Sequence, residues 1–406
     1  MTHRLSSLGV LSVVVFAAAC ADGNATNIAV RPGIDVLLQD STHLLSDQRV
    51  GLLTNQTGVD RNGVSDLSRL LDAGAQVTAI FSPEHGYHGV LNTSEIGNTV
   101  DSATGLPVFS LYGAARAPTE EMLALLDIMV IDLQDIGARP YTYISTALHT
   151  MEACAAHGTP VILLDRPNPI GGTLVQGPLL DTALTSFVGM LPVPLRHAMT
   201  LGELAMFGND RLEIGADLTV IPAAGWRREM WFDATGLPWV RPSPSMPDLE
   251  SATHYPGTVI FEATNLSVGR GTSVAFQVVG APWLDASAVV TAMGELPGVD
   301  LRDTTVTPAD PPDGKFGGQV VHAVRLRATN RTAYDPVVTA VALLIAVRDA
   351  HPEALVVNER SLALRIGTRE LWNAAQAGET AWTLAGRWEA ALGRFRAVRE
   401  AYLLYP

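Results

Sequence analysis

The segment Gln76-Val77-Thr78-Ala79-Ile80-Phe81-Ser82-Pro83-Glu84-His85-Gly86 decides the fold, because a short apolar run ends abruptly in a polar turn. A nearly continuous apolar run of this length is typical of a strand buried on both faces. Further runs of this kind occur at residues 49–55, 107–111, 128–133 and 161–164. Helical spacing of apolar residues separates them at residues 65–73, 119–126 and 143–157. Strands that alternate with helices predict a parallel sheet covered on both faces, which is a Rossmann-like, doubly wound α/β fold.

The chain beyond residue 192 has a different pattern. Residues 222–248 are rich in Trp, Pro and Gly, which indicates irregular structure able to cover a cleft. The predicted elements that follow are strands at 258–261, 275–279 and 320–327 and helices at 336–350 and 381–399. Because 406 residues are too many for one ordinary core, we expect two domains. They are a Rossmann-like N-terminal domain at residues 33–252 and a smaller α+β domain at residues 253–406.

The first twenty residues have the features of an export signal. Arg4 supplies a positive charge, and residues 8–19 form an apolar stretch too short for a membrane-spanning helix. Small residues lead up to Cys20, which is the predicted lipid-bearing residue, and residues 21–32 are the predicted stalk. A simple secretory signal is the alternative. Either interpretation predicts an exported protein that is lipid-anchored in the cell envelope or is periplasmic or secreted. The lipid on Cys20 would be its only membrane contact.

The composition excludes several classes of partner and mechanism. A net charge of -14 repels phosphate backbones, so no nucleic-acid partner is expected. Lys315 is the only lysine, which removes most lysine-dependent mechanisms. No G-x-G-x-x-G fingerprint follows the first strand, and no G-x-S-x-G or H-E-x-x-H motif occurs. His85 and His88 lack a convincing further ligand set, so neither a metal nor a cofactor is expected.

Polar side chains follow several predicted strands at the point where each strand ends. Ligands of open parallel sheets bind beyond the carboxyl ends of the strands, so these side chains are expected to face one crevice. They are Asn55, Glu84, His85, Asp132, Gln134, Asp135, Asp165, Arg166 and Asn168. An Asp at such a position can instead hold the following loop through backbone hydrogen bonds, and Asp165 is interpreted mainly in this way.

The remaining mixture of carboxylates, amides, arginines and aromatic residues suits carbohydrate chemistry. Glycosidic cleavage needs a carboxylic acid that protonates the leaving oxygen, together with a second protein group or an assisting group of the substrate. Glu84 is the first candidate for the acid, with helix capping as its alternative role. Glu262, which follows an apolar run, and Glu152, in a predicted helix, are the further catalytic candidates. Their alternatives are a structural ion pair and a solvated helix acid. The second group can act as a general base, and the other candidates for this role are Asp132, Asp135 and Asp165.

Other residues are predicted to bind the sugar. Arginines bind anionic substituents in bidentate fashion, and the candidates are Arg139, Arg166, Arg241 and Arg270. Asn265 lies close to Glu262 in the sequence and fits sugar binding. Tyr141 and Tyr143 can stack on sugar faces, although core packing is the more common role of a single aromatic residue.

Six longer motifs are distinctive. They are Leu53-Thr54-Asn55-Gln56-Thr57-Gly58, Ser82-Pro83-Glu84-His85-Gly86, Asp132-Leu133-Gln134-Asp135-Ile136-Gly137-Ala138-Arg139, Asp165-Arg166-Pro167-Asn168-Pro169, Pro242-Ser243-Pro244-Ser245-Met246-Pro247 and Thr264-Asn265-Leu266-Ser267-Val268-Gly269-Arg270-Gly271-Thr272. These motifs resemble those of a once-uncharacterised bacterial family, the exo-β-N-acetylmuramidases. The similarity runs from about Gly33 to the C-terminal Tyr402-Leu403-Leu404-Tyr405.

The resemblance implies a Rossmann-like N-terminal domain followed by a smaller α+β domain. It implies an exo-acting glycoside hydrolase that releases N-acetylmuramic acid from the non-reducing end of peptidoglycan fragments. Glu84 would be catalytic in an interdomain cleft. Glu262 and Glu152 both stand at positions that resemble the family pattern. Three departures from the family pattern leave the fine substrate preference open: Pro140, Ala263 and Val268.

N-acetylmuramic acid carries a lactyl carboxylate, so an acidic protein needs a local positive pocket to bind it. The four arginines named above are the available groups. A non-catalytic cell-wall sugar-binding lipoprotein is the alternative function, and a nucleotide-dependent enzyme is a third. Retention or inversion of configuration depends on the separation of two carboxylates, so both mechanisms stay open.

Overall fold

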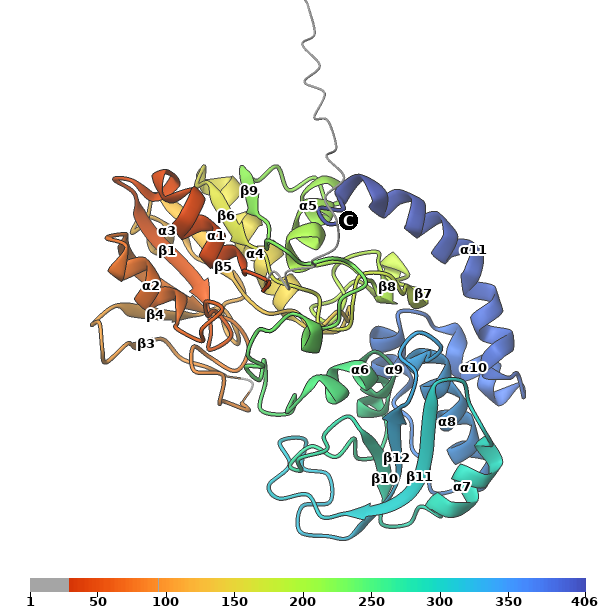
Figure 1. The fold of residues 1–406 in the computed structure, drawn as a ribbon. Coiled ribbons are helices and arrows are strands. Elements are labelled where there is room, and N and C mark those ends of the chain that lie inside the picture. Colours follow the sequence, from red (N-terminus) through yellow and green to blue (C-terminus); the bar gives the residue numbers. More distant parts are fainter. Residues whose placement is uncertain (1–28, 94) are drawn as a thin grey trace, which may run out of the picture.

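A seven-stranded sheet forms the centre of the N-terminal half in the computed structural model, which describes residues 29–93 and 95–406 (Figure 1). Its order is β3-β4-β2-β1-β5-β6-β9, and the short β3 alone runs antiparallel to its neighbour. The strands are β1 (Arg49–Thr54), β2 (Gln76–Ser82), β3 (Thr99–Val100), β4 (Pro107–Ser110), β5 (Ile128–Asp132), β6 (Val161–Leu164) and β9 (Leu218–Ile221). The order reverses between β1 and β5, which confirms the predicted doubly wound fold.

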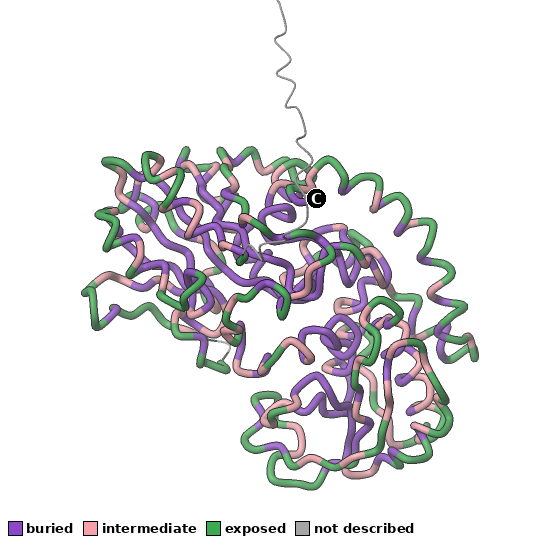
Figure 2. The backbone as a smooth tube through the Cα atoms, viewed as in Figure 1, coloured by how far each residue is buried: buried purple, intermediate pink, exposed green. Residues whose placement is uncertain are grey.

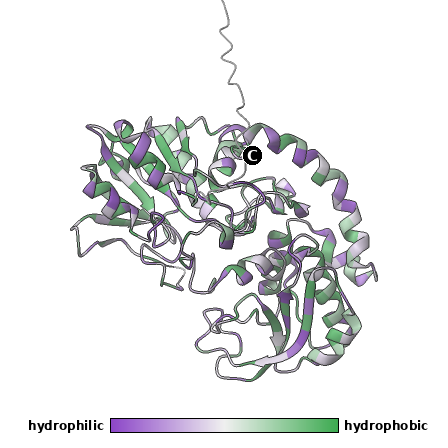
Figure 3. Ribbon diagram, in the orientation of Figure 1, coloured by the Kyte–Doolittle hydropathy of each residue, from purple (hydrophilic) through white to green (hydrophobic). Residues whose placement is uncertain are grey.

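Both faces of this sheet are buried, as the apolar strands require. Successive side chains of a strand point to opposite faces. Leu52 of β1 therefore packs in one apolar cluster with Ile34 and Leu70, whereas Leu53 packs in the other with Leu148. The helices of this half are α1 (Gly33–Asp40), α2 (Asp66–Asp72), α3 (Glu120–Leu123), α4 (Tyr143–His157) and α5 (Leu201–Arg211). Figure 2 shows the resulting concentration of buried backbone, and Figure 3 shows that the strands are mainly hydrophobic.

Shorter elements complete the N-terminal half. They are the strand pair β7 (Gln176–Leu179) and β8 (Pro194–Arg196), with the 3-10 helices η1 (Thr42–Leu45), η2 (Thr182–Leu184) and η3 (Phe232–Ala234). Apart from η3 and the single bridge of Ala224 to Arg31, residues 222–248 have no regular structure, as predicted. Trp226 in this segment is almost completely buried, so the segment packs on the body and is not a free loop.

The C-terminal half is smaller and contains a three-stranded antiparallel sheet of order β10-β12-β11. Its elements are α6 (Leu249–Thr258), η4 (Val259–Ala263), β10 (Val278–Ala281), α7 (Ala286–Met293), β11 (Val299–Val306), β12 (Val321–Ala328), α8 (Pro336–Ala350), α9 (Glu359–Ile366), α10 (Glu370–Gln376), α11 (Ala381–Arg399) and η5 (Glu400–Tyr402). The helices predicted at 336–350 and 381–399 are confirmed as α8 and α11.

The strand predicted at residues 258–261 is wrong, because this run ends α6 and continues into η4. Asp248 starts the helix, and its carboxylate accepts a hydrogen bond from the Ser251 amide at 2.8 Å. The apolar run is fully buried, and so short a run has no periodicity that separates a strand from a buried helix. The strand predicted at 275–279 begins only at Val278, because Phe276 has a positive φ of 63°.

The chain ends on the N-terminal half. Helix α11 runs along the outside of the molecule from the C-terminal half to the N-terminal half (Figure 1). The Tyr405 hydroxyl then donates a hydrogen bond to Asp165 at 2.6 Å and accepts one from the Ala223 amide at 2.9 Å. Val30 shares an apolar cluster with Tyr405, so the folded body begins before residue 33, within the predicted stalk.

The predicted export signal and Cys20 lie outside the described residues. Among residues 29–93 and 95–406, no helix combines the length and apolarity needed to cross a membrane.

Candidate active site

A cavity of about 470 Å³ contains two of the three predicted catalytic glutamates. The N-terminal half contributes Glu84, His85, Asn92, Thr93, Tyr112, Arg116, Pro140, Tyr141, Thr142, Tyr143, Phe187, Val188, Ser243 and Met246. The C-terminal half contributes Tyr255, Glu262, Arg270, Phe276, Pro312, Asp313, Lys315 and Arg365. Both halves of the chain therefore contribute to this cavity, which we call the active-site pocket.

Glu84 reaches the pocket because β2 ends just before it. Pro83 stops the strand, and His85 and Gly86 both adopt left-handed backbone conformations, with φ of 72° and 75°. The His85 ring is held by the Leu91 carbonyl, which lies 2.7 Å from Nδ1. Such a turn is costly for a residue other than glycine and fixes the direction of the preceding side chain.

Hydroxyl groups surround the Glu84 carboxylate. Thr142, which immediately precedes α4, donates a hydrogen bond from Oγ1 to Glu84 Oε2 at 2.5 Å. Burial, and then the negative charge of Glu84, raise the pKa of Tyr112 to about 12, so this phenol stays protonated. Glu84 therefore lies beside neutral hydrogen-bond donors, and no described ion pair involves it.

An aromatic wall stands next to Glu84. The rings of Tyr141 and Tyr143 lie 4.9 Å apart, and the Tyr255 ring lies 5.8 Å from that of Tyr141. Asn55 supports this wall from behind, since its Nδ2 donates to the Tyr143 hydroxyl at 2.8 Å and its Oδ1 accepts from the Thr57 amide at 2.9 Å. Tyr141 and Tyr143 thus reach the predicted pocket, whereas Asn55 lies behind it.

Glu262 forms the second charged group of the pocket and is bound to two arginines. Arg270 donates from Nε to Glu262 Oε1 at 2.8 Å, and Arg365 Nε lies 3.5 Å from Oε2. Burial by itself would raise the pKa of Glu262, but the two arginines outweigh it and hold this pKa below its usual value. Glu262 is therefore ionised at neutral pH.

Cations outnumber acids around Glu262. Lys315 Nζ donates to the Leu266 carbonyl at 2.8 Å and also lines the pocket. With Arg270 and Arg365 it gives three positive groups against Glu262 and Asp313. This side of the pocket is consequently suited to an anionic substituent, although the protein as a whole is acidic.

The ionisation of Glu262 predicts an acid-dependent contribution to stability. Its pKa in the folded protein lies below the usual 4.5, so the carboxylate stabilises the fold above that pH, and this contribution is lost as the pH falls through the lowered pKa. The difference in unfolding free energy between the native protein and Glu262→Gln should therefore be largest at neutral pH and shrink below pH 4.5. Urea unfolding at a series of pH values measures it. A difference that grows on acidification would contradict the ion pair.

Several predicted binding residues lie beneath the sheet edge and hydrogen-bond the protein itself. Arg166 pairs with Asp132, with Nη2 2.8 Å from Oδ2, and both side chains are buried. This pair lies at the crevice between β1 and β5, beside Gln134 and Trp239, where a cavity of only about 10 Å³ remains. The position at which Rossmann-like folds bind nucleotides is thus occupied by the protein's own side chains.

The polar residues around this pair hold neighbouring loops. Gln134 donates to the Pro167 carbonyl at 2.9 Å, and Asn168 donates to the Met199 carbonyl at 2.9 Å. Asp135 accepts from the Gly137 amide at 2.6 Å. Asp165 accepts from the Thr200 hydroxyl at 2.6 Å and from Tyr405. None of these four predicted site residues lines the active-site pocket.

Arg139 contributes to the pocket only indirectly. Its guanidinium is buried and donates to the carbonyls of Pro178 at 3.0 Å, Val193 at 2.8 Å and Arg365 at 3.1 Å. The bond to the Arg365 carbonyl joins the two halves of the chain, and the side chain of Arg365 pairs with Glu262. Arg139 thereby fixes the backbone from which Arg365 extends.

The three other predicted residues lie away from the pocket. Glu152 is on the outer face of α4, pairs with His149 at 2.9 Å and is about half exposed. Arg241 is exposed, and its carbonyl accepts from Gln56. Asn265 binds the Ala354 carbonyl at 2.8 Å, which ties down a neighbouring loop.

Other pocket residues are absent from the sequence prediction. They include Tyr112, Arg116, Thr142, Tyr255, Lys315 and Arg365. Thr142 lies between two tyrosines that were predicted, and Lys315 is the only lysine, so both had a recognisable signal. Arg365 had none, because it reaches the pocket from a helix far along the chain.

Comparison with known proteins identifies the relatives of this chain. The models of the N-terminal and C-terminal parts of exo-β-N-acetylmuramidase NamZ match residues 50–250 and 253–405. Peptidoglycan β-N-acetylmuramidase NamZ of Bacillus subtilis (strain 168) is 38% identical, over 99% of this chain and 98% of that protein. A crystal structure of a DUF1343 family protein from Bacteroides fragilis NCTC 9343 is similar with a TM-score of 0.86 and 32% identity, over 93% of this chain and 100% of that chain. A second such structure from the same organism has a TM-score of 0.72 at 32% identity, over 93% and 99%.

The two-part fold, the carboxylate pocket and these similarities define an enzyme of the glycoside hydrolase class. Within that class, the chain belongs to the exo-β-N-acetylmuramidase NamZ family, which confirms the resemblance found in the motifs.

Proposed function

We propose that this enzyme releases N-acetylmuramic acid from the non-reducing end of peptidoglycan fragments, in the pocket between the two halves of the chain. The observation that supports this most strongly is that Glu84, beside hydroxyl groups, lines one cavity together with three cations, Arg270, Lys315 and Arg365. A cavity of about 470 Å³ has the volume of a small-ligand site and is large enough for one substituted sugar.

Glu84 acts in this proposal as the general acid that protonates the departing glycosidic oxygen. The Thr142 hydroxyl fixes one carboxyl oxygen, which leaves the other available to the substrate. Tyr112 is neutral and adds no charge that would compete for the proton. Tyr141 and Tyr143 line the pocket beside Glu84, but both rings are buried, so they shape this part of the pocket rather than offer an open face for stacking.

Glu262 has a different role, because its two arginine partners reduce its basicity. An ionised carboxylate can stabilise the positive charge that develops on the sugar ring in the transition state. It also holds Arg270 and Arg365 in place. Together with Lys315, these arginines are the groups that bind the lactyl carboxylate of N-acetylmuramic acid.

A direct assay tests this function. The purified protein is incubated with the 4-nitrophenyl glycosides of N-acetylmuramic acid and of N-acetylglucosamine, and the products are identified by mass spectrometry. We expect hydrolysis of the first and little of the second. A glycan capped by N-acetylglucosamine at its non-reducing end should yield no N-acetylmuramic acid. Saturable binding without any product would instead support a sugar-binding lipoprotein.

We also propose that the protein is exported and carries a lipid on Cys20, as the residues before it predict. Metabolic labelling with a fatty acid should mark the native protein and leave a Cys20→Ser variant unlabelled, with the variant found in the soluble envelope fraction. A labelled Cys20→Ser variant would contradict this site of attachment.

A further inference from the structure

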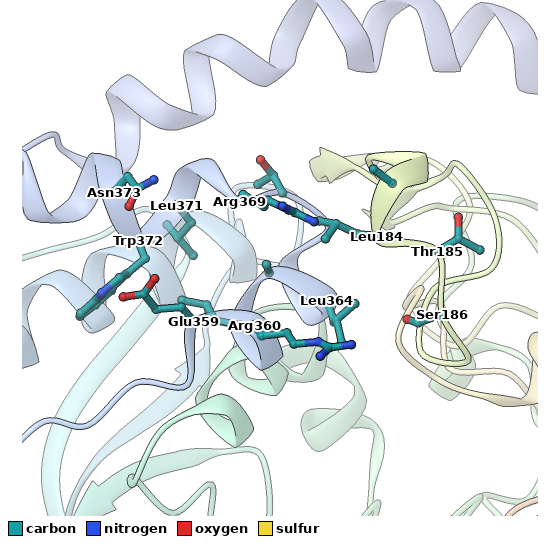
Figure 4. Close-up of a pocket in the computed structure, with 14 residues that line it drawn as sticks. Leu184, Thr185, Ser186, Glu359, Arg360, Leu364, Arg369, Leu371, Trp372 and Asn373 are labelled. Carbon is teal, nitrogen blue, oxygen red and sulfur yellow. The ribbon is translucent and has the colours of Figure 1, made fainter.

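A second cavity, of about 580 Å³, lies between the N-terminal half and helices α9 and α10 (Figure 4). We call it the outer pocket. It is lined by Ala183, Leu184, Thr185, Ser186, Glu359, Arg360, Leu362, Ala363, Leu364, Thr368, Arg369, Leu371, Trp372 and Asn373. Its volume is typical of a ligand site. No residue of the outer pocket has a role in the proposed chemistry.

The two pockets share their walls. Ser186 lines the outer pocket, and the next two residues, Phe187 and Val188, line the active-site pocket. On α9, Leu364 faces the outer pocket and the adjacent Arg365 faces the active-site pocket. An α-helix with its side chains is about 10 Å across. The two pockets therefore lie against the same helix, α9, and only a substrate of several sugars can extend past this helix from one pocket to the other.

The wall between the pockets is held firmly. Besides the bond from Arg139 to the Arg365 carbonyl, the Asp181 amide donates to the Gly367 carbonyl at 2.8 Å. These two contacts attach the end of α9 to the N-terminal half. A ligand that touched both pockets would thus meet a preformed surface, and little free energy would be spent on ordering it.

The side chains of the outer pocket suit a sugar chain with a negative charge. Trp372 is half-buried and offers an indole ring for stacking on a sugar face. Arg360 and Arg369 are exposed, and both extend toward the segment that contains Leu184 and Ser186 (Figure 4). Their two positive charges outnumber the one negative charge of Glu359, so the outer pocket favours a carboxylate.

We propose that the outer pocket binds the sugars on the reducing side of the cleaved bond in longer peptidoglycan fragments. This inference rests on the proposed function. In fragments without stem peptides every second sugar is a muramic acid with a free lactyl group, so a lactyl carboxylate recurs one disaccharide repeat beyond the sugar in the active-site pocket. That carboxylate binds Arg360 and Arg369, while Trp372 stacks on a neighbouring ring.

Paired substrates test the proposal. Hydrolysis of the disaccharide N-acetylmuramyl-N-acetylglucosamine is compared with that of the tetrasaccharide made of two such units. Trp372→Ala, and separately the double variant Arg360→Gln with Arg369→Gln, should lower kcat/KM for the tetrasaccharide on the order of tenfold and leave the disaccharide unchanged, because only the longer substrate reaches the outer pocket. The matched control is Trp382→Ala, since Trp382 is 52% exposed on α11 and outside both pockets.

Loss of activity toward both substrates to the same extent, or toward neither, would overturn the proposal. A binding experiment separates this failure from a failure of the proposed function. A tetrasaccharide that ends in N-acetylglucosamine at the non-reducing end is titrated calorimetrically into the native enzyme and into Trp372→Ala. We expect binding to the native enzyme that the variant loses, whether or not any fragment is hydrolysed. Equal binding by both proteins would remove the outer pocket from substrate recognition.

Discussion

Glu84→Gln is expected to lower kcat/KM for the disaccharide N-acetylmuramyl-N-acetylglucosamine by roughly 100- to 10,000-fold, which is the usual contribution of a general acid. Glutamine keeps the size of the side chain and the acceptor for the Thr142 hydroxyl, but it has no proton to give to the leaving oxygen. The fold should be unaffected, because the described ion pairs do not include Glu84. Steady-state kinetics with thermal unfolding of both proteins measures the two effects.

A comparison of two leaving groups tests more directly whether Glu84 acts as an acid. Nitrophenolate departs without protonation, so the same variant should lose much less activity toward the 4-nitrophenyl glycoside of N-acetylmuramic acid. Glu152→Gln is the matched control, since Glu152 is a glutamate of the same half that does not line the pocket, and this variant should retain full activity. Equal losses for both substrates would argue that Glu84 acts in some way other than as an acid, and full activity would remove it from the mechanism.

Arg270→Gln and Arg365→Gln are each expected to weaken binding of N-acetylmuramic acid by roughly 10- to 100-fold, which corresponds to one hydrogen bond between charged groups. Binding of N-acetylglucosamine, which lacks the lactyl carboxylate, should change far less. Both arginines line the active-site pocket, and each keeps one face toward Glu262. Calorimetric titration with the two free sugars gives the dissociation constants directly.

Helix α9 supplies the control for this prediction. Arg360→Gln removes a charge from the same helix but on the side of the outer pocket, so a monosaccharide should bind this variant as it binds the native enzyme. If replacement of Arg270 weakens both sugars equally, the arginine only supports Glu262 and does not contact the carboxylate.

The parallel sheet was predictable because its strands are short, apolar and separated by amphipathic helices. The spacing of apolar residues within one strand or helix is a local property of the sequence. For this reason β2, α4 and α11 begin and end close to their predicted bounds. The run at 258–261 was predicted wrongly, because its burial comes from packing in the C-terminal half and its four residues carry no period.

The candidate site was predictable where a residue follows a strand and is marked by its neighbours. Glu84 follows the end of β2 and lies in a turn set by its neighbours Pro83 and Gly86, and Arg270 belongs to a distinctive motif. Asp132 and Arg166 satisfy the same rule, yet they neutralise each other beneath the sheet edge. Sequence position could not distinguish a residue that lines the pocket from one that is paired inside the protein, because this depends on which side chains come together in the fold. Arg365 was unpredictable for the same reason.

The start of the described chain and its C-terminal end meet at one corner of the larger half, where Val30 and Tyr405 share an apolar cluster. If the lipid proposed on Cys20 is present, the anchored segment enters the folded body at this corner, so the anchor holds the molecule by its larger half. The same geometry matters in the laboratory. A fusion partner at the C-terminus would follow closely on Tyr405, whose hydroxyl binds Asp165, so a spacer is needed to leave this contact intact.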